Sequence, residues 1–247
     1  MASPKNQYTK EMYDQFGYFA TWMPNVRLKL GDVGVFRKHE LSSFTTLEQL
    51  GIKYRIRRGH RRATYEYRSK GTVSVEPKGA GEAPIEASML TTAEAGVVIK
   101  FSRPNAIYFH LDNALIDVIS DQDDVGKEIL NRYSLGDWSE DYAVVTEVIT
   151  AESSIVLISS ANDGRVVFKT EVALKQAELE LGGAMVGLSL ATFRGIQTQV
   201  IGEEGLTPLF RARKVKRRFP VIGSKTFRSD ADAVFDEMTY DDMYGKG

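Results

Sequence analysis

The chain of 247 residues contains no cysteine, few histidines and no long apolar segment. Without cysteine it has no disulfide bond, no thiolate zinc site and no cysteine nucleophile. No apolar run reaches the roughly 18 residues of a transmembrane helix. The N-terminal residues lack the apolar core of a signal peptide, Ala2 stands where myristoylation requires glycine, and prenylation has no cysteine to modify. We therefore expect a cytoplasmic protein without a lipid anchor.

Motifs for catalysis and metal binding are also missing. The histidines are far apart in the sequence, and His60 lies in a basic run that would repel a metal ion. The segment Asp121–Gly126 is similar to the start of a calcium loop, but Val125 and Arg132 occupy positions that require oxygen ligands. Nucleophile elbows, phosphate loops and dinucleotide fingerprints are absent. The sequence predicts no enzymatic activity, no metal, no cofactor and no small-molecule substrate.

What is present is the patterning of a mixed fold. We predict one α+β domain over residues 1–223, with a twisted, largely antiparallel β-sheet and flanking helices. A short helix is expected from Thr9, ended by Gly17. Two further helices are expected between Leu115 and Tyr133, meeting near Asp121, because apolar residues recur there every three or four positions.

Two strand patterns are distinctive. Apolar residues alternate with polar ones from Ile85 to Phe101, which is much longer than a typical strand of about five or six residues. Two ordinary strands fit this pattern, and so does a surface able to extend into longer sheet. Residues 154–159 and 165–174 are predicted to form a hairpin, because Asn, Asp and Gly at 162–164 tolerate the positive φ of a tight turn.

Positive charge is concentrated in two segments of a chain whose net charge is -1. Residues 53–70 contain a single acid, and residues 211–218 contain none. Cations on one face of a strand suit the phosphates of anionic lipid or of nucleic acid, although faces neutralised by carboxylates of the same chain fit equally well. The candidate phosphate-binding residues are Arg55, Arg57, Arg58, Arg61, Arg62, Arg211, Arg213, Lys214, Lys216, Arg217 and Arg218.

The C-terminal tail, residues 224–247, has a different character from the preceding domain. From Ser229 onward it carries six carboxylates against one lysine. Interspersed are five large apolar residues: Phe235, Met238, Tyr240, Met243 and Tyr244. A frayed terminus is one interpretation, but a fully solvated tail seldom contains so many large apolar residues. Docking of the tail onto the domain is therefore at least as well supported.

The segment Asp141–Ile149 resembles a strand of the gasdermin pore-forming domain, where Val-Val-Thr-Glu-Val-Leu follows a helical stretch. The closest match is Val144–Val148, and the order of predicted elements from about residue 15 to residue 222 is similar to that of the family. Two features differ from the family. The chain lacks the N-terminal cysteine that bacterial members often carry for lipidation. It also has only the tail after Ser224 in place of the large inhibitory domain of animal members.

The resemblance implies a pore-forming effector that moves from the cytoplasm to an anionic membrane on activation, forms a homo-oligomer and causes lysis or cell death in defence. In lipid, only a closed barrel of such strands satisfies the backbone. The tail's apolar residues would anchor it over a basic face and restrain the domain. The membrane-inserting ribbons would contain Ala87, Met89, Ala93, Ala95, Val97, Ile99, Phe101, Val166, Phe168, Val172, Met185, Val186, Leu188 and Leu190.

Two other functions fit the same residues. The basic faces suit a non-enzymatic nucleic-acid-binding module, which would bind DNA or RNA in a salt-sensitive way without lysing vesicles. The chain also fits a structural component of a protein assembly, which would form ordered oligomers and bind neither membranes nor nucleic acid.

Overall fold

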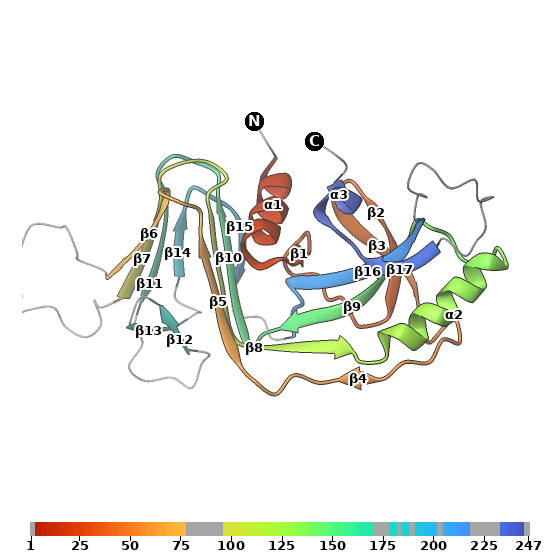
Figure 1. The fold of residues 1–247 in the computed structure, drawn as a ribbon. Helices are drawn as coiled ribbons and strands as arrows, with labels where there is room; N and C mark the ends of the chain where they lie inside the picture. Colours follow the sequence, from red (N-terminus) through yellow and green to blue (C-terminus); the bar gives the residue numbers. More distant parts are fainter. Residues whose placement is uncertain are drawn as a thin grey trace, which may run out of the picture. The chain divides into compact units, whose positions relative to one another are not determined.

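The structure is a computed structural model, and it describes residues 3–77, 96–169, 178–181, 184–187, 191–201, 205–217 and 233–244. Its helices are α1 (Pro4–Phe16), α2 (Gln122–Ser134) and α3 (Tyr240–Tyr244). Its strands are β1 (Phe19–Ala20), β2 (Asp32–Arg37), β3 (Glu40–Thr46), β4 (Ile56–Arg57), β5 (Ala63–Arg68), β6 (Val73–Pro77), β7 (Gly96–Phe101), β8 (Ile107–Ile119), β9 (Tyr142–Thr150), β10 (Ser153–Ser159), β11 (Gly164–Lys169), β12 (Glu178–Leu181), β13 (Ala184–Gly187), β14 (Ala191–Arg194), β15 (Ile196–Ile201), β16 (Leu209–Arg217) and β17 (Ala233–Glu237). The predicted α+β class is confirmed, and the strand pairs are antiparallel (Figure 1). Among the described residues, no helix is both long and apolar enough to cross a membrane.

The chain divides into two compact units, where one domain was expected over residues 1–223. The first unit contains Met1–Glu11, Arg62–Ala114 and Ala151–Gly205. The second contains Met12–Arg61, Leu115–Thr150 and Leu206–Gly247, and so includes the tail. Strand β8 contributes residues 107–114 to the first unit and residues 115–119 to the second.

The first unit is built from two sheets. In one, β5, the first part of β8, β10 and β15 pair in that order. In the other the order is β14-β11-β7-β6, and β12 and β13 pair separately. Alternate residues of a strand point to opposite faces, so each sheet contributes one apolar face to the core. That core contains Val97, Ile99, Phe101, Ala106, Tyr108, Ile155, Leu157, Val166 and Phe168.

In the second unit, β9 is paired on both of its edges. Strand β16 lies along one edge, and β2 and the end of β8 pair with the other. Beyond them, β3 pairs with β2, β4 pairs with β8, and both β1 and β17 pair with β16. The core includes Phe19 and Phe210, whose ring centroids are 5.7 Å apart. It also includes Val144 and Val148, the two ends of the segment that resembles the gasdermin strand.

Helix α1 begins earlier than predicted, at Pro4 rather than near Thr9. Proline suits the first position of a helix because the missing N–H has no partner there in any helix. The Thr9 hydroxyl donates to the carbonyl of Lys5 within the helix and caps nothing. The predicted end is correct, because Gly17 adopts a φ of 69° directly after Phe16.

One prediction about strand pairing and one about a helix are wrong. Residues 115–119 form the end of β8 instead of a helix, because their backbone pairs with β9. The turn at 161–164 joins two different sheets, since β10 pairs with β8 and β15 whereas β11 pairs with β7 and β14. In each case a partner distant in sequence overrides the local pattern.

The residues predicted to insert into membranes fall into three groups. Val97, Ile99 and Phe101 on β7 and Val166 and Phe168 on β11 are buried in the core of the first unit. Met185 and Val186 lie on β13, whose side chains are not described. The others lie outside the described residues: Ala87, Met89, Ala93, Ala95, Val172, Leu188 and Leu190.

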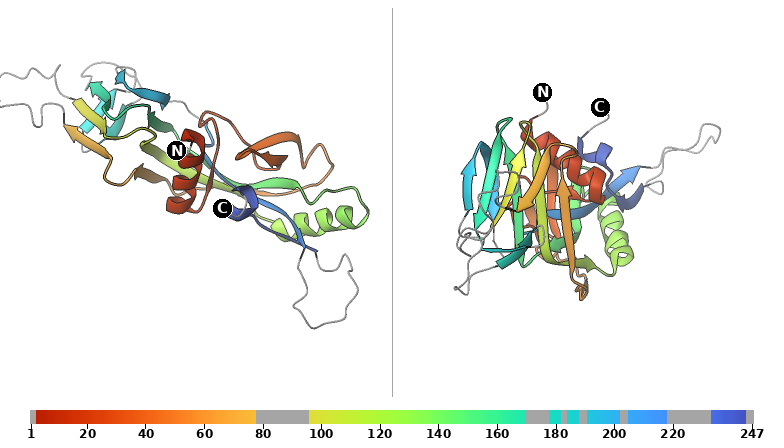
Figure 2. Two further views of the ribbon diagram at one scale, coloured as in Figure 1. Left: turned by 90° about the horizontal axis from the view of Figure 1, so that it is seen from above. Right: turned by 90° about the vertical axis from the view of Figure 1, so that its left-hand side faces the viewer.

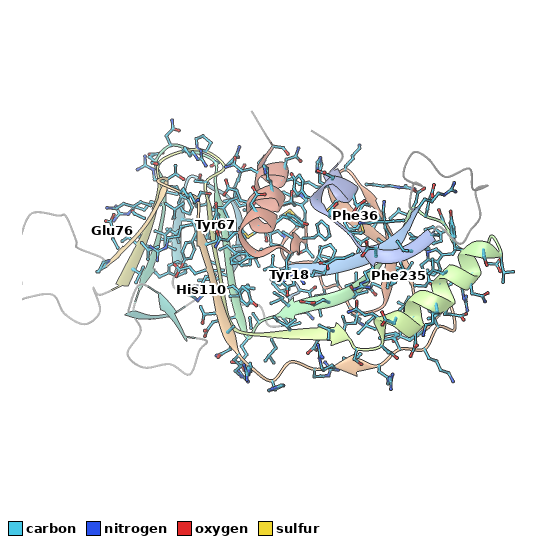
Figure 3. The ribbon with its side chains drawn as sticks, in the orientation of Figure 1. Tyr18, Phe36, Tyr67, Glu76, His110 and Phe235 are labelled. Atoms are coloured by element: carbon cyan, nitrogen blue, oxygen red, sulfur yellow. The ribbon has the colours of Figure 1, made fainter. Side chains whose placement is uncertain are left out.

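His110 is an unusual polar residue on β8 in the first unit (Figure 3). It is only 4% exposed, and neither ring nitrogen has a hydrogen-bond partner among the described residues. Its ring stacks on that of Tyr108, with centroids 6.4 Å apart. Burial lowers the pKa of His110 below 6.5, because it outweighs the upward effect of the Glu66 and Asp112 carboxylates, and Arg68 lowers it further.

We expect His110 to make the fold less stable in acid. Its pKa is lower in the folded chain, so the unfolded chain binds the proton more tightly. The resulting loss in the free energy of unfolding is absent above pH 6.5. It grows as the pH falls toward the pKa of His110 in the folded chain, and it is constant below that pKa. The free energy of unfolding can be measured between about pH 5 and 8. As the pH is lowered through this range, it should decrease less in His110→Phe than in the natural chain. Parallel profiles would contradict this assignment.

Candidate functional site

The second basic segment forms most of strand β16, and the acidic tail pairs with it. Strand β17 is antiparallel to β16, with Arg213 opposite Glu237 and Lys214 opposite Asp236. Figure 2 shows the two strands side by side at the C-terminal, blue end of the colour scale. The tail thus continues the sheet and places its carboxylates next to the cations of β16.

Asp242, at the start of α3, holds two lysines of β16. Its Oδ2 is 2.8 Å from the Nζ of Lys216, and its Oδ1 is 3.8 Å from the Nζ of Lys214. The backbone N–H and hydroxyl of Thr239 also donate to Oδ2, at 2.7 and 2.9 Å. Burial acts to raise the pKa of Asp242, but the hydrogen bonds from Lys216 and Thr239 outweigh it, so the pKa is lowered. The carboxylate is therefore held in its charged form.

The arginines of β16 have partners in both the tail and the rest of the unit. Arg211 lies 3.5 Å from Glu237 and 4.0 Å from Glu147, and its guanidinium stacks 4.3 Å from the ring centroid of Tyr18. Arg217 lies 3.0 Å from Glu140 and donates to the hydroxyl of Tyr133 at 2.9 Å. In the part of the segment that the structure describes, only Arg213 has no ion pair. Arg218 lies outside the described residues.

The tail's apolar residues contribute to the core of the second unit. Met238 and Met243 are 3% and 8% exposed. Phe235, labelled in Figure 3, packs against α2, where a Cβ added to Gly126 would lie 3.1 Å from its ring. The ring of Tyr240 is 5.4 Å from that of Tyr13. The side chain of Tyr244 is not described.

These apolar contacts dominate the attachment of the tail. Burying one large apolar side chain contributes about 1.5 to 3 kcal/mol, whereas an exposed ion pair contributes about 0 to 1 kcal/mol. Met238 and Met243 together therefore outweigh the pairs made by Glu237 and Asp242. The two methionines therefore supply more of the free energy that holds the tail than its ion pairs do.

A cavity in the second unit brings the two basic segments together. Its volume is about 550 Å³, and Arg55 and Arg57 line it together with Arg213. The first turn of α2 contributes Asp123 and Asp124 to the wall, and its second turn contributes Lys127. Asp121 and Glu147 complete the charged lining. Arg55 pairs with Asp121 at 3.2 Å and Lys127 with Asp124 at 3.1 Å. Arg57 and Arg213 have no ion pair among the described residues, so their guanidinium groups are available to an anion, while the lining as a whole has four carboxylates and four cations.

The other cations of the first basic segment lie elsewhere. Arg58 pairs with Asp117 at 2.8 Å, and the N–H of Gly59 donates to the same carboxylate at 2.9 Å. Arg62 belongs to the first unit, where it pairs with Glu152. Arg61 is exposed and makes no ion pair within the described ranges. The five arginines therefore do not form one continuous patch of unpaired charge.

Sequence reasoning missed the acids on which this arrangement depends. Glu147 lies inside an apolar strand, and Glu140 lies in a short polar connection. Neither has a local signal that predicts a basic partner, because the arginines they contact are more than 60 positions away. Among the described residues, no group of three His, Cys, Asp or Glu side chains could hold a metal ion.

No protein-family model matches this chain, and no curated protein is similar to it in sequence. The gasdermin resemblance therefore stays a hypothesis based on Val144–Val148 and on the order of elements.

Replacing Asp242 with Asn should loosen the tail without removing its apolar anchors. The charge that pairs with Lys214 and Lys216 disappears, and we expect the amides of β17 to exchange hydrogen faster, by a few-fold to about tenfold. Asp241→Asn is the matched control, because Asp241 is exposed and makes no ion pair among the described residues. Equal exchange rates in both variants would show that Asp242 contributes nothing to holding β17.

Proposed function

We propose that this protein is a membrane-binding, pore-forming effector of the gasdermin type, kept inactive by its own C-terminal tail. The observation that carries the proposal is the pairing of β17 with β16, together with the contacts of Asp242 with Lys214 and Lys216. An acidic strand that covers a basic one must be displaced before those cations can reach an anionic surface. The tail would thus act as a displaceable inhibitory segment.

Release of the tail would expose several cations at once. Lys214 and Lys216 would lose their partner Asp242, and Arg211 would lose Glu237. Each cation near an anionic membrane contributes about 1 kcal/mol, so several acting together give useful affinity. The cavity lined by Arg55, Arg57 and Arg213 would receive a lipid phosphate, which guanidinium groups bind with two parallel hydrogen bonds. The protein would thus pass from the cytoplasm to the membrane only after activation.

The strands of the first unit have the pattern that insertion requires. On β7, Val97, Ile99 and Phe101 are buried whereas Lys100 is exposed, and on β11 Val166 and Phe168 are buried whereas Arg165 is exposed. One face of each strand is therefore apolar, as the lipid-facing side of a transmembrane barrel strand is, and the other face carries Lys100 or Arg165, although Val98 on that face of β7 is also buried. A homo-oligomer would close the barrel and satisfy every backbone group in lipid.

Cleaving the tail should activate the protein. We suggest inserting a specific protease site near Arg228 and comparing dye release from anionic vesicles before and after cleavage. Cleavage leaves all residues present, so the core contacts of Met238 and Met243 persist until the tail dissociates. We expect leakage to rise well above that of the uncut chain, with little leakage from neutral vesicles.

Each other outcome of this assay has a definite meaning. If neither form releases dye while circular dichroism shows both folded, the pore proposal is contradicted. If uncut and cut protein leak equally, the pore proposal survives but the tail does not restrain it. Salt-sensitive binding to DNA or RNA without leakage would favour the second candidate, a nucleic-acid-binding module, which the same guanidinium-lined cavity supports.

The cavity should account for much of the membrane affinity. In the cleaved protein, replacing Arg57 and Arg213 together by Gln removes about 2 kcal/mol, and vesicle binding should weaken by roughly 30-fold in co-sedimentation. The control is Lys53→Gln with Lys70→Gln, which removes the same charge from exposed positions outside the cavity. Unchanged binding in the arginine variant would eliminate the proposed role of the cavity, and equal weakening in both would indicate a diffuse charge effect.

A further inference from the structure

Three cations lie in register across the outer sheet of the first unit. Lys100 on β7 is opposite Arg165 on β11, and Arg165 is opposite Arg194 on β14. Residues directly opposite on antiparallel strands point to the same face. All three are exposed, whereas their neighbours Phe101 and Val166 are buried in the core. The three side chains therefore form a cation row on the outer face of the sheet.

Such a row is unfavourable by itself. Side chains directly opposite on neighbouring strands have Cβ atoms about 5 Å apart, and like charges at this distance repel. Two acids relieve the outer members: Glu76 on β6 lies 2.6 Å from Lys100, and Asp163 lies 2.8 Å from Arg194. The central cation, Arg165, has no ion pair among the described residues.

Glu76, labelled in Figure 3, pairs with only one cation of the row, Lys100. Hydrogen bonds from Lys100 and Ser74 lower the pKa of Glu76, and the charge of Arg165 lowers it further. The carboxylate is therefore committed mainly to Lys100. Among the described residues, Arg165 at the centre of the row therefore has no carboxylate of its own.

A cavity adjoins two of the three members of the row. Its volume is about 690 Å³, and Lys100 and Arg165 line it. The lining also includes Gly71–Ser74, at the start of β6, and Asn162–Gly164, in the turn before β11. An anion in this cavity could reach two members of the cation row at once.

We propose that the cation row binds a small soluble ligand that carries consecutive phosphate groups. Neighbouring strands are about 4.8 Å apart, so the three cations span about 10 Å. A single phosphate can bridge only two neighbours, whereas a chain of phosphates follows the whole row. Arginine guanidinium groups bind phosphate oxygens in pairs, which favours phosphate over a halide or a single carboxylate. This site is distinct from the cavity at Arg55, Arg57 and Arg213 and does not depend on pore formation.

Isothermal titration with inorganic tripolyphosphate tests the proposal on the full chain. We expect binding that is at least tenfold tighter than that of orthophosphate and that weakens with salt. Arg165→Gln should weaken tripolyphosphate binding by about tenfold or more, because it removes a charge-assisted hydrogen-bond donor. Glu76→Gln should strengthen it, because a competing carboxylate is lost. Lys53→Gln removes a cation from the other unit and should leave the affinity unchanged.

Thermal unfolding provides a second readout. Without ligand, Arg165→Gln should raise the melting temperature, because repulsion within the row falls. Addition of tripolyphosphate should raise the melting temperature of the natural chain more than that of this variant. Absence of binding, equal affinity for orthophosphate, or no effect of Arg165→Gln would each overturn the proposal. Binding to vesicles that contain a bisphosphorylated inositol lipid, without binding to tripolyphosphate, would also overturn it and identify a lipid headgroup as the ligand.

Discussion

The second unit depends on the backbone pairing between β16 and β17. Strand β16 is already paired with β9, and β1 pairs with it only at Leu209 and Phe210, so residues 213–217 would expose unpaired N–H and C=O groups without β17. The same strand pairing positions Met238 to fill the core and Glu237 and Asp242 to meet the cations. Hydrogen bonding, apolar burial and charge neutralisation are thus coupled in one element. Removing β17 would disturb all three together.

Charge in this molecule is balanced locally. The net charge of -1 conceals strands that are strongly basic, because the carboxylates that neutralise them come from other parts of the chain. Arg57, Arg61, Arg165 and Arg213 have no ion pair among the described residues. Of these four, all but Arg61 line a cavity, where an unpaired cation has space beside it for a ligand. Both proposed sites follow from this coincidence.

Local patterns were sufficient to predict the fold class and several elements. Helix α2 has apolar residues at helical spacing, and β9 is rich in β-branched residues. The end of α1 was predictable because glycine readily adopts the left-handed conformation that Gly17 has. The end of β8 was not, because Leu115, Val118 and Ile119 are spaced like helical residues and only pairing with β9 makes them a strand. Nor can a turn sequence specify whether its flanking strands pair with each other.

By itself, the sequence determined that the chain has two basic segments and an acidic tail with apolar anchors, since these are contiguous in the chain. It could not reveal that Arg55, Arg57 and Arg213 line one cavity, because they come from segments separated by about 150 positions. It gave no sign of the cation row either, because Lys100, Arg165 and Arg194 are isolated charges in three strands. Only the antiparallel register decides that they face one another, and register is a property of strand pairing rather than of any single strand.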